Sequence, residues 1–327
     1  MEQVAPAQTL WGLINTHTIA RCIHVIAEAG VADAVGDQPR PVAELAAATG
    51  LDSGALGRML RLVSSHGVFA SDPRGWVHTP ASMLLRSDHP QSLRSFARMI
   101  GMPAIWRGFT DLEHAARTGS PAIDSAGHFA YFAEHPDEAS LFNQAMAGKS
   151  AAVVPAVVDA CDFGRFRTVA DIGGGRGHLL RAILERAPAA SGILFDLPHV
   201  IADCSNAGSS RLRLMAGDFF HDTLPVSDAY VLMEVLHDWT DDKAAKILSA
   251  IRRAAPAHAR VLIVEALVSE SPEPHFGKML DIIMLAVTGG RERTAPEYER
   301  LLASTGFRLE RVVPTPSQYS VVEASVA

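Results

Sequence analysis

The stretch Thr168-Val-Ala-Asp-Ile-Gly-Gly-Gly-Arg-Gly-His178 decides the fold, because it joins a short apolar run directly to a glycine-rich turn. The pattern predicts a buried strand over residues 168–172, a loop with glycines at 173, 174, 175 and 177, and a helix over 178–186. Glycines tolerate positive φ angles and let a ligand approach the backbone closely. The following helix offers free N–H groups and the positive end of its dipole. The segment therefore predicts an α/β protein with a ligand-binding loop.

The spacing of these glycines limits which ligand the loop can hold. A dinucleotide-binding G-x-G-x-x-G loop counted from Gly173 would need glycine or alanine at the position of His178. A P-loop would need a Gly-Lys-Ser/Thr sequence, which does not follow. G-x-G-x-G after the acidic strand end at Asp171 suits a nucleoside with a charged amino-acid tail, such as S-adenosylmethionine. An ordinary glycine turn of an α/β protein is the alternative.

Carboxylates also follow at the ends of the next two predicted strands. Asp196 ends an apolar run 25 residues after Asp171, where an acid in a βαβ unit faces the ribose hydroxyls. Asp218 ends the third run with Phe219 beside it, which offers a carboxylate and an apolar ring to adenine. Either acid alone would be an ordinary loop residue. Acids at three successive strand ends favour a single nucleoside site.

A histidine and a glutamate follow on the same predicted rim. The apolar run 229–236 predicts a strand that stops at His237, and the run 260–265 ends on Glu265. Ligands of open α/β sheets lie beyond the carboxyl ends of the strands. His237 is therefore a candidate general base, with Glu265 one strand away. A surface or capping histidine is the alternative.

Five segments occur in a characteristic order: 169–177, 195–200, 217–220, 235–242 and 289–294. Together they resemble the S-adenosylmethionine-dependent small-molecule O-methyltransferases. This family of homodimers includes plant caffeate and flavonoid enzymes and bacterial antibiotic-tailoring enzymes. The resemblance implies an α/β fold with a Rossmann-like seven-stranded methyltransferase sheet and an N-terminal helical, winged-helix dimerisation domain.

The resemblance also implies roles for individual residues. His237 matches the family's catalytic base, and Glu265 and Glu292 match the two glutamates that flank and orient it. Many relatives carry a cofactor-binding lysine four residues before the histidine, where this chain has Met233. The implied cofactor site comprises Asp171, Gly173, Gly175, Asp196, Leu197, Asp218, Phe219 and Met233, and the candidates for the acceptor pocket are Phe142, Met146 and Met284.

Composition argues against several other classes of protein. The length of 327 residues predicts two domains, and the net charge of −7 argues against a nucleic-acid partner. The sequence has no apolar run of 18 residues and no leader pattern, so we expect no membrane partner and a cytoplasmic location. Cys22, Cys161 and Cys204 are widely spaced, and no histidine spacing is typical of a metal site. We therefore expect neither disulfides nor a bound metal.

The N-terminal part predicts helices over 9–19 and 21–34, and then a helix–turn–helix and hairpin over 41–78, as in a winged helix. Residues 1–100 carry eight arginines and eight acids, which leaves no positive face for DNA. We expect three parts: a dimerisation domain over 1–90, a helical bridge over 91–160 that contributes to the acceptor pocket, and a cofactor-binding domain over 161–327.

These observations predict an enzyme that moves the methyl group of S-adenosylmethionine to a hydroxyl of a small phenolic or related aromatic metabolite. Neutral His237 would take the proton of that hydroxyl. One alternative is an enzyme of the same fold that uses the cofactor without methyl transfer, as a hydroxylase, decarboxylase or pericyclase. The other is a ligand-sensing winged-helix regulator, which the charge count disfavours.

Overall fold

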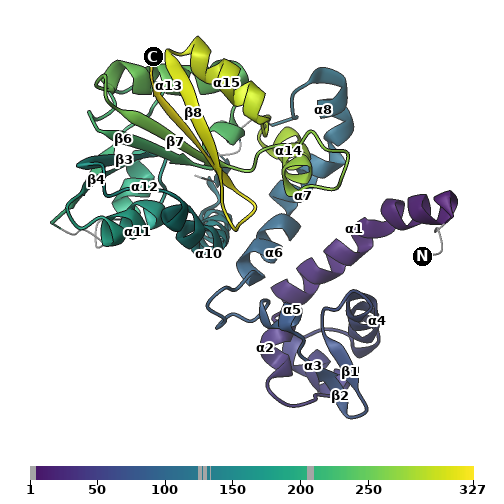
Figure 1. Cartoon of the computed structure of the whole chain (residues 1–327). Coiled ribbons are helices and arrows are strands. Elements are labelled where there is room, and N and C mark those ends of the chain that lie inside the picture. Colours follow the sequence, from purple (N-terminus) through teal and green to yellow (C-terminus); the bar gives the residue numbers. More distant parts are fainter. Residues whose placement is uncertain (1–4, 124–126, 128–130, 133, 205–209) are drawn as a thin grey trace. The chain divides into compact units, whose positions relative to one another are not determined.

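The computed structural model describes residues 5–123, 127, 131, 132, 134–204 and 210–327 (Figure 1). The chain divides into two compact units. Unit 1 comprises Met1–Trp106 and His135–Lys149, and unit 2 comprises Arg107–Glu134 and Ser150–Ala327. The predicted bridge, residues 91–160, is thus divided between the two units.

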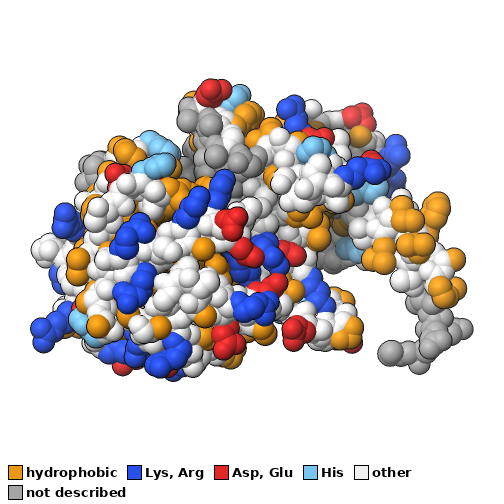
Figure 2. Space-filling view, turned by 90° about the horizontal axis from the view of Figure 1, so that it is seen from above, with side chains coloured by type: hydrophobic (Ala, Val, Ile, Leu, Met, Phe, Trp, Pro, Cys, Tyr) orange, Lys and Arg blue, Asp and Glu red, His pale blue; other side chains and the backbone are white. Residues whose placement is uncertain are grey.

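One long helix, α1 (Pro6–Glu28), begins unit 1 where the sequence predicts two helices. No proline follows Pro6 within it, and the chain first adopts a left-handed conformation at Gly30, where φ is 70°. The helix therefore continues through the position of the predicted break. Four large apolar side chains of α1 are exposed, and Figure 2 shows hydrophobic side chains gathered at the right-hand edge of the view. They are Leu10, Trp11, Leu13 and Ile14.

Short helices and a hairpin complete unit 1. Asp52 caps α4 by accepting the N–H of Ala55 at 2.7 Å, which satisfies one of the free donors at the start of the helix. Helices α3 and α4 followed by the β1–β2 hairpin are compatible with the predicted winged helix. The elements are α2 (Val31–Val35), α3 (Val42–Thr49), α4 (Ser53–Ser64), β1 (Ala70–Asp72), β2 (Gly75–Val77), α5 (Pro80–Met83) and α6 (Arg94–Gly101). Two helices, α7 (Pro103–Thr110) and α10 (Pro136–Ala160), contribute residues to both units.

Unit 2 contains the predicted seven-stranded sheet, in the order β5-β4-β3-β6-β7-β9-β8. Strands β3 to β7 are parallel, and the β8–β9 hairpin pairs antiparallel with β7. The carboxyl ends of five parallel strands therefore share one rim. The strands are β3 (Thr168–Ile172), β4 (Ser191–Asp196), β5 (Leu212–Ala216), β6 (Ala229–Met233), β7 (Arg260–Glu265), β8 (Phe307–Pro314) and β9 (Ser320–Val326).

Helices cover both faces of this sheet (Figure 1). Apolar residues of α11 (His178–Arg186), α14 (Phe276–Val287) and the end of α10 form one buried cluster with the sheet. Residues of α13 (Asp241–Ala254) and α15 (Ala295–Ser304) form the cluster on the other face. Two further helices of unit 2 are α8 (Leu112–Thr118) and α12 (Pro198–Asp203).

Strand β6 ends earlier than the apolar run 229–236 predicts. Its last residue is Met233, and Glu234 follows with a φ of 55°, a conformation that is uncommon for residues other than glycine. Val235 and Leu236 are apolar because they enter the core cluster beside α13, and they do not extend the strand. The turn at Glu234 leads into the short 3₁₀ helix η2 (Leu236–Asp238), which carries His237.

Candidate active site

The glycine loop between β3 and α11 is shaped by close backbone contacts. Gly173 and Gly175 have φ angles of 69° and 56°, in the region that favours glycine. A Cβ on Gly174 would overlap the carboxyl group of Asp171, so the loop backbone lies directly on that side chain. A Cβ on Gly175 would meet no atom within 4 Å. The loop is therefore open at Gly175, where a ligand can reach the backbone.

Asp196 ties this loop to the end of β4. Its two carboxylate oxygens accept the backbone N–H groups of Gly175 and Leu197, each at 2.7 Å. Burial raises the pKa of Asp196, and these two donors oppose the rise. A carboxylate offers about four acceptor positions. Asp196 can therefore still accept from the two neighbouring hydroxyls of a ribose.

Asp171 lies beneath the loop and is almost completely buried. Neither of its carboxyl oxygens has a close hydrogen-bond partner among the described residues, and the backbone N–H of Leu180 acts only to lower its pKa. Burial and, secondly, the charge of Asp196 raise the pKa of Asp171 to about 7. Because Asp171 is covered by the loop, we expect any effect of this residue on a ligand to act through the loop backbone and through charge.

Phe219 supplies an apolar wall on the neighbouring side of the loop. Its ring would lie 3.7 Å from a Cβ on Gly173, and it packs edge-to-face against Phe220 and Trp239. Asp218 is half-buried, and its Oδ1 accepts the N–H of Phe220 at 2.8 Å. The carboxylate of Asp218, the residue before Phe219, would thus be available near a flat base that Phe219 covers.

Leu197 directly follows Asp196 at the end of β4, and Met233 lies at the end of β6. Leu197 is the N-cap of α12 and is half-buried. Met233 ends β6 and packs against the apolar cluster beneath α10, α11 and α14. Met233 therefore adds apolar surface where many relatives have a lysine.

These residues fit S-adenosylmethionine. The open loop can receive the amino-acid tail, Asp196 the ribose and Phe219 the adenine. The orphaned carboxyl of Asp171 favours a cationic ligand, because a nearby positive charge stabilises an ionised acid.

His237 and Glu292 form a buried pair next to this region. Nδ1 of His237 lies 2.6 Å from Oε1 of Glu292, and both side chains are almost fully excluded from solvent. Burial alone would lower the pKa of His237, but the charges of Asp238, Glu292 and Glu265 outweigh it and raise the pKa to about 10. The free protein therefore favours the imidazolium, whereas the predicted mechanism uses the neutral form. The proton must leave before His237 can act as a base.

Glu265 contacts the backbone of His237 and not its imidazole. Oε1 of Glu265 accepts the N–H of His237 at 3.0 Å, and its Oε2 accepts the hydroxyl of Tyr298. Burial raises the pKa of Glu265 to about 8, while His237 and Arg293 act in the opposite direction. Glu265 thus holds the turn that carries the candidate base.

The three candidates for the acceptor pocket belong to different units. Met284 is buried on α14 in unit 2. Phe142 and Met146 are half-buried on the part of α10 that is grouped with unit 1. Their part in an acceptor pocket stays a prediction.

Sequence reasoning missed three residues of the rim. Arg293 is buried and donates hydrogen bonds to backbone carbonyl oxygens on both sides of His237. It lies within the motif 289–294, but it is not among the predicted site residues. Tyr298 donates to Glu265, and the hydroxyl of Tyr319 donates to Glu234 at 2.8 Å. The motif could have indicated that Arg293 has a role in the site, but a sequence does not show that an arginine is buried.

A cavity of about 520 Å³ lies at the opposite ends of the strands, next to the starts of β3, β6 and β7. The residues that line it include Arg167, Asp228 and His258. Within the described part of the chain, no group of three or more His, Cys, Asp or Glu side chains is arranged to hold a metal ion. None of the described helices combines the length and apolar character needed to cross a membrane.

Two family models match the chain. An O-methyltransferase domain matches residues 109–308, and an O-methyltransferase dimerisation domain matches residues 11–88. The chain is 44% identical to the phenazine O-methyltransferase PhzM of Lysobacter antibioticus, over 95% of this chain and 94% of that protein. It is 35% identical to an 8-amino-8-demethylriboflavin N,N-dimethyltransferase of Streptomyces davaonensis, over 97% of this chain and 94% of that protein.

The fold of the chain is also similar to that of a solved structure. The S-adenosylhomocysteine-bound methyltransferase CalO1 of calicheamicin biosynthesis has a TM-score of 0.87 and 35% identity, over 99% of this chain and 100% of that chain. The fold, the geometry of the rim and these matches agree. The chain belongs to the S-adenosylmethionine-dependent O-methyltransferase family, whose members act on small aromatic metabolites.

Proposed function

We propose that this enzyme methylates a hydroxyl of a planar aromatic metabolite, with His237 as the general base. The observation that carries the proposal is the buried 2.6 Å contact between Nδ1 of His237 and Glu292. A phenolic hydroxyl has a pKa near about 10 and is a poor nucleophile while it keeps its proton. A histidine held by a carboxylate is an arrangement that can remove this proton.

Some residues of the rim bind the cofactor, and others take part in proton transfer. Asp196 and the glycine loop hold the cofactor, and Phe219 covers its base. When bound, S-adenosylmethionine supplies an electrophilic methyl group on a positively charged sulfur. Nε2 of His237 takes the proton of the acceptor hydroxyl as its oxygen becomes the nucleophile. Glu292 stabilises the resulting imidazolium through Nδ1, and Glu265 keeps the turn in place through the N–H of His237.

The charge of His237 adds a condition to this mechanism. Its pKa, raised to about 10 in the free protein, must fall for the neutral base to be populated. A positive charge brought close to an imidazole lowers its pKa by repulsion. We therefore expect the neutral form of His237 to be favoured once the cationic cofactor is bound.

Hydroxylated tricyclic aromatics are the first acceptors to test, because a relative at 44% identity is named a phenazine O-methyltransferase. A nitrogen acceptor is the second candidate, since another relative is named an N,N-dimethyltransferase. A neutral amine already offers its lone pair, so it would not require the His237–Glu292 pair before attack. That pair favours the hydroxyl.

We propose in addition that the enzyme is a homodimer joined through α1. Its side chains Leu10, Trp11, Leu13 and Ile14 are 59–73% exposed, and a contiguous apolar patch of this kind marks a protein interface. The match of residues 11–88 to a dimerisation domain supports a second copy of this chain as the partner.

The test is incubation with methyl-labelled S-adenosylmethionine and a panel of hydroxylated and amino-substituted tricyclic aromatics. Mass spectrometry detects the product, and NMR locates the methyl group on oxygen or nitrogen. We expect O-methylation by the wild type and a loss of about 10²–10⁴-fold in His237→Ala. The exposed His66→Ala serves as the matched control. Methylation of nitrogen alone, or equal turnover in both variants, would contradict the proposal, and consumption of an acceptor without methylation would favour the alternative chemistry of the fold.

A further inference from the structure

The turn that carries His237 is held by a second loop, residues 288–293. The N–H of Arg291 donates to the carbonyl oxygen of His237 at 2.8 Å. A Cβ on Gly290 would overlap that same carbonyl oxygen, so the two backbones lie in direct contact there. The loop also brings in Glu292, which binds the imidazole of His237. Loop and turn therefore form one packed unit around the candidate base.

Arg293, the last residue of this loop, bonds the turn on both sides of His237. Its Nη1 donates to the carbonyl oxygen of Leu236 at 3.1 Å, and its Nη2 donates to that of Trp239 at 2.9 Å. Its Nε donates to Oδ1 of Asp241 at 2.9 Å. One planar guanidinium thus fixes the residue before His237, the second residue after it and the first turn of α13.

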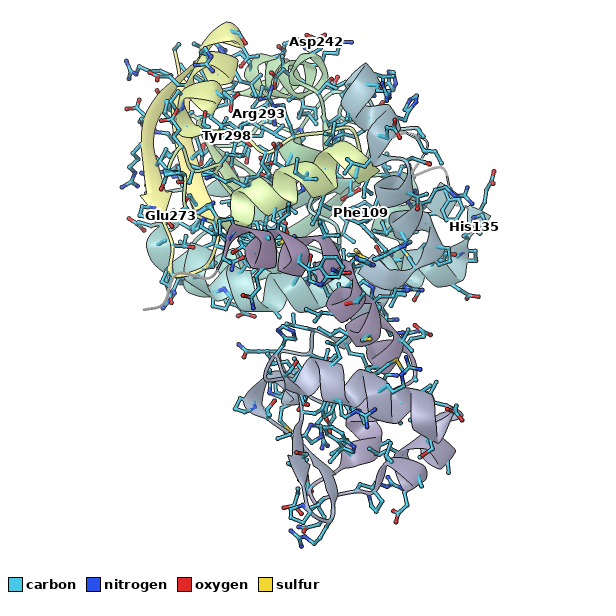
Figure 3. The ribbon with its side chains drawn as sticks, turned by 90° about the vertical axis from the view of Figure 1, so that its right-hand side faces the viewer. Phe109, His135, Asp242, Glu273, Arg293 and Tyr298 are labelled. Atoms are coloured by element: carbon cyan, nitrogen blue, oxygen red, sulfur yellow. The ribbon has the colours of Figure 1, made fainter. Side chains whose placement is uncertain are left out.

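The burial of Arg293 indicates that these contacts are specific. Only 1% of the residue is exposed, and its guanidinium lies 5.7 Å from the ring centre of Tyr298. Figure 3 labels both residues. A buried charge costs free energy unless its donors are satisfied, and an apolar side chain of similar size would avoid that cost. Arginine offers a rigid fork of donors that lysine and apolar residues lack. The fork matches the two carbonyls that flank the base.

We propose that Arg293 is a positioning residue for catalysis, which fixes the turn 236–239 so that Nδ1 of His237 stays on Glu292 and Nε2 faces the acceptor. The proposal rests on the proposed function of His237. Arg293 touches neither the imidazole nor any reacting atom, so its effect on the reaction is indirect. A displacement of about 1 Å in a reacting group can reduce a rate by about 10²-fold.

The positive charge of Arg293 gives a second, separable effect. It is one of the groups that oppose the burial-driven rise in the pKa of Glu265. Without this charge Glu265 is protonated more readily, so one of the carboxylates that stabilise the imidazolium of His237 is lost. Losing Arg293 also removes a positive charge that repels the imidazolium, so the pKa of His237 is sensitive to the charge of Arg293 by two routes. Lysine would keep the charge but lose the fork.

Four variants distinguish the effect of the hydrogen-bonding fork of Arg293 from the effect of its charge and from a failure to fold. Arg293→Met removes both the fork and the charge, and Arg293→Lys removes the fork only. Asp241→Asn leaves Arg293 in place but replaces the charged acceptor of its Nε by a neutral amide oxygen, and Arg291 keeps Glu297 as a partner. The matched control is Asp242→Asn, which removes an equal charge from the same first turn of α13 and lies apart from Arg293 (Figure 3).

The experiment measures kcat, the KM for the acceptor and the Kd for S-adenosylhomocysteine, each over a range of pH. We expect kcat to fall about 10- to 100-fold in both Arg293 variants, with Kd within about twofold of wild type. The acid limb of the pH profile shifts in Arg293→Met and stays in place in Arg293→Lys. Asp241→Asn loses part of kcat, and Asp242→Asn matches the wild type.

Hydrogen exchange of the backbone amides of Asp238 and Trp239 reports the position of the turn without any turnover. We expect faster exchange in Asp241→Asn than in Asp242→Asn. If Arg293→Met fails to fold, Asp241→Asn decides the question. Equal kcat and equal exchange in Asp241→Asn and Asp242→Asn would overturn the proposal. Failure of the proposed function has a different signature, because His237→Ala would then keep full turnover while the exchange still responds to Arg293.

Discussion

Replacing Glu292 by glutamine tests the pair at the centre of the rim. The change keeps the size of the side chain and removes the negative charge that faces Nδ1 of His237 at 2.6 Å. A glutamine that turns its NH₂ group toward Nδ1 would also favour the tautomer with the proton on Nε2. That tautomer cannot accept a proton from the acceptor at Nε2. The variant therefore weakens the imidazolium and disturbs the tautomer of the base.

The size of the effect follows from the burial of both partners. A hydrogen bond to a charged group contributes about 1.5–3 kcal/mol, so the loss of this one should lower kcat by about 10- to 150-fold. The same free energy lowers the pKa of His237 by about one to two pH units from its raised value. Because the neutral form is the base, the acid limb of kcat moves to lower pH. The fall in rate is therefore read at the high-pH plateau.

The assay is a pH series of kcat at saturating acceptor and cofactor, with the affinity for S-adenosylhomocysteine measured by calorimetry. Glu273→Gln, at an exposed position, is the matched control (Figure 3). We expect Glu292→Gln to bind the product normally and to turn over slowly. A plateau kcat within about threefold of the control would refute the reasoning, because a pair worth 1.5 kcal/mol or more changes a rate by about tenfold or more.

Three further changes test other parts of the structure. Asp196→Asn leaves one of the two N–H donors at 2.7 Å without an acceptor and the other with a neutral one, so the Kd for S-adenosylhomocysteine should rise about 5- to 150-fold by calorimetry; an unchanged Kd would remove Asp196 from the site. The pKa of Asp171 is raised from 3.8 to about 7, so this acid favours folding below about pH 4 and that contribution is lost as pH rises through about 7. Between pH 4 and pH 8, the free energy of unfolding of the wild type should therefore fall by about 1–4 kcal/mol relative to that of Asp171→Asn, as measured by urea titrations. If the free energies of unfolding of the two proteins changed in parallel with pH, the burial of a titrating acid would be contradicted. The double change of Leu10 and Ile14 to aspartate puts charge on the exposed face of α1 and should yield a monomer in analytical ultracentrifugation; a dimer that resists both charges must be joined elsewhere.

Much of the rim could be predicted because parallel strands end at one edge of a sheet. Asp171, Asp196, His237 and Glu265 each follow an apolar run, and the sheet order brings those ends to one rim. The pairing of His237 with Glu292 could not be predicted in this way, because 55 residues separate them in the sequence. Only the family resemblance predicts that the two residues act together.

The turn at Glu234 could not be predicted from the pattern of apolar residues. Val235 and Leu236 continue the apolar run of β6, and nothing in the run indicates that they enter the core beside α13 after a left-handed residue. That turn moves the N–H of His237 onto Glu265. The actual contact of Glu265 therefore depends on a backbone conformation that single-residue preferences disfavour.

Helix α1 and Arg293 show two other limits. The pattern of apolar residues divides 9–34 into two helices, but a helix ends only where a breaker or cap ends it, and the first is at Gly30. Arginine is a surface residue on average, so a buried Arg293 on backbone carbonyls is visible only in three dimensions.

The central claim is that His237 takes the acceptor proton during methyl transfer. Its most direct test is a single-turnover reaction with enzyme in excess over a hydroxylated tricyclic acceptor, in which product release does not limit the observed rate. The rate constant of His237→Ala should be about 10²–10⁴-fold below that of the wild type at equal cofactor occupancy. Equal rate constants for the two proteins would contradict the assignment of His237 as the base.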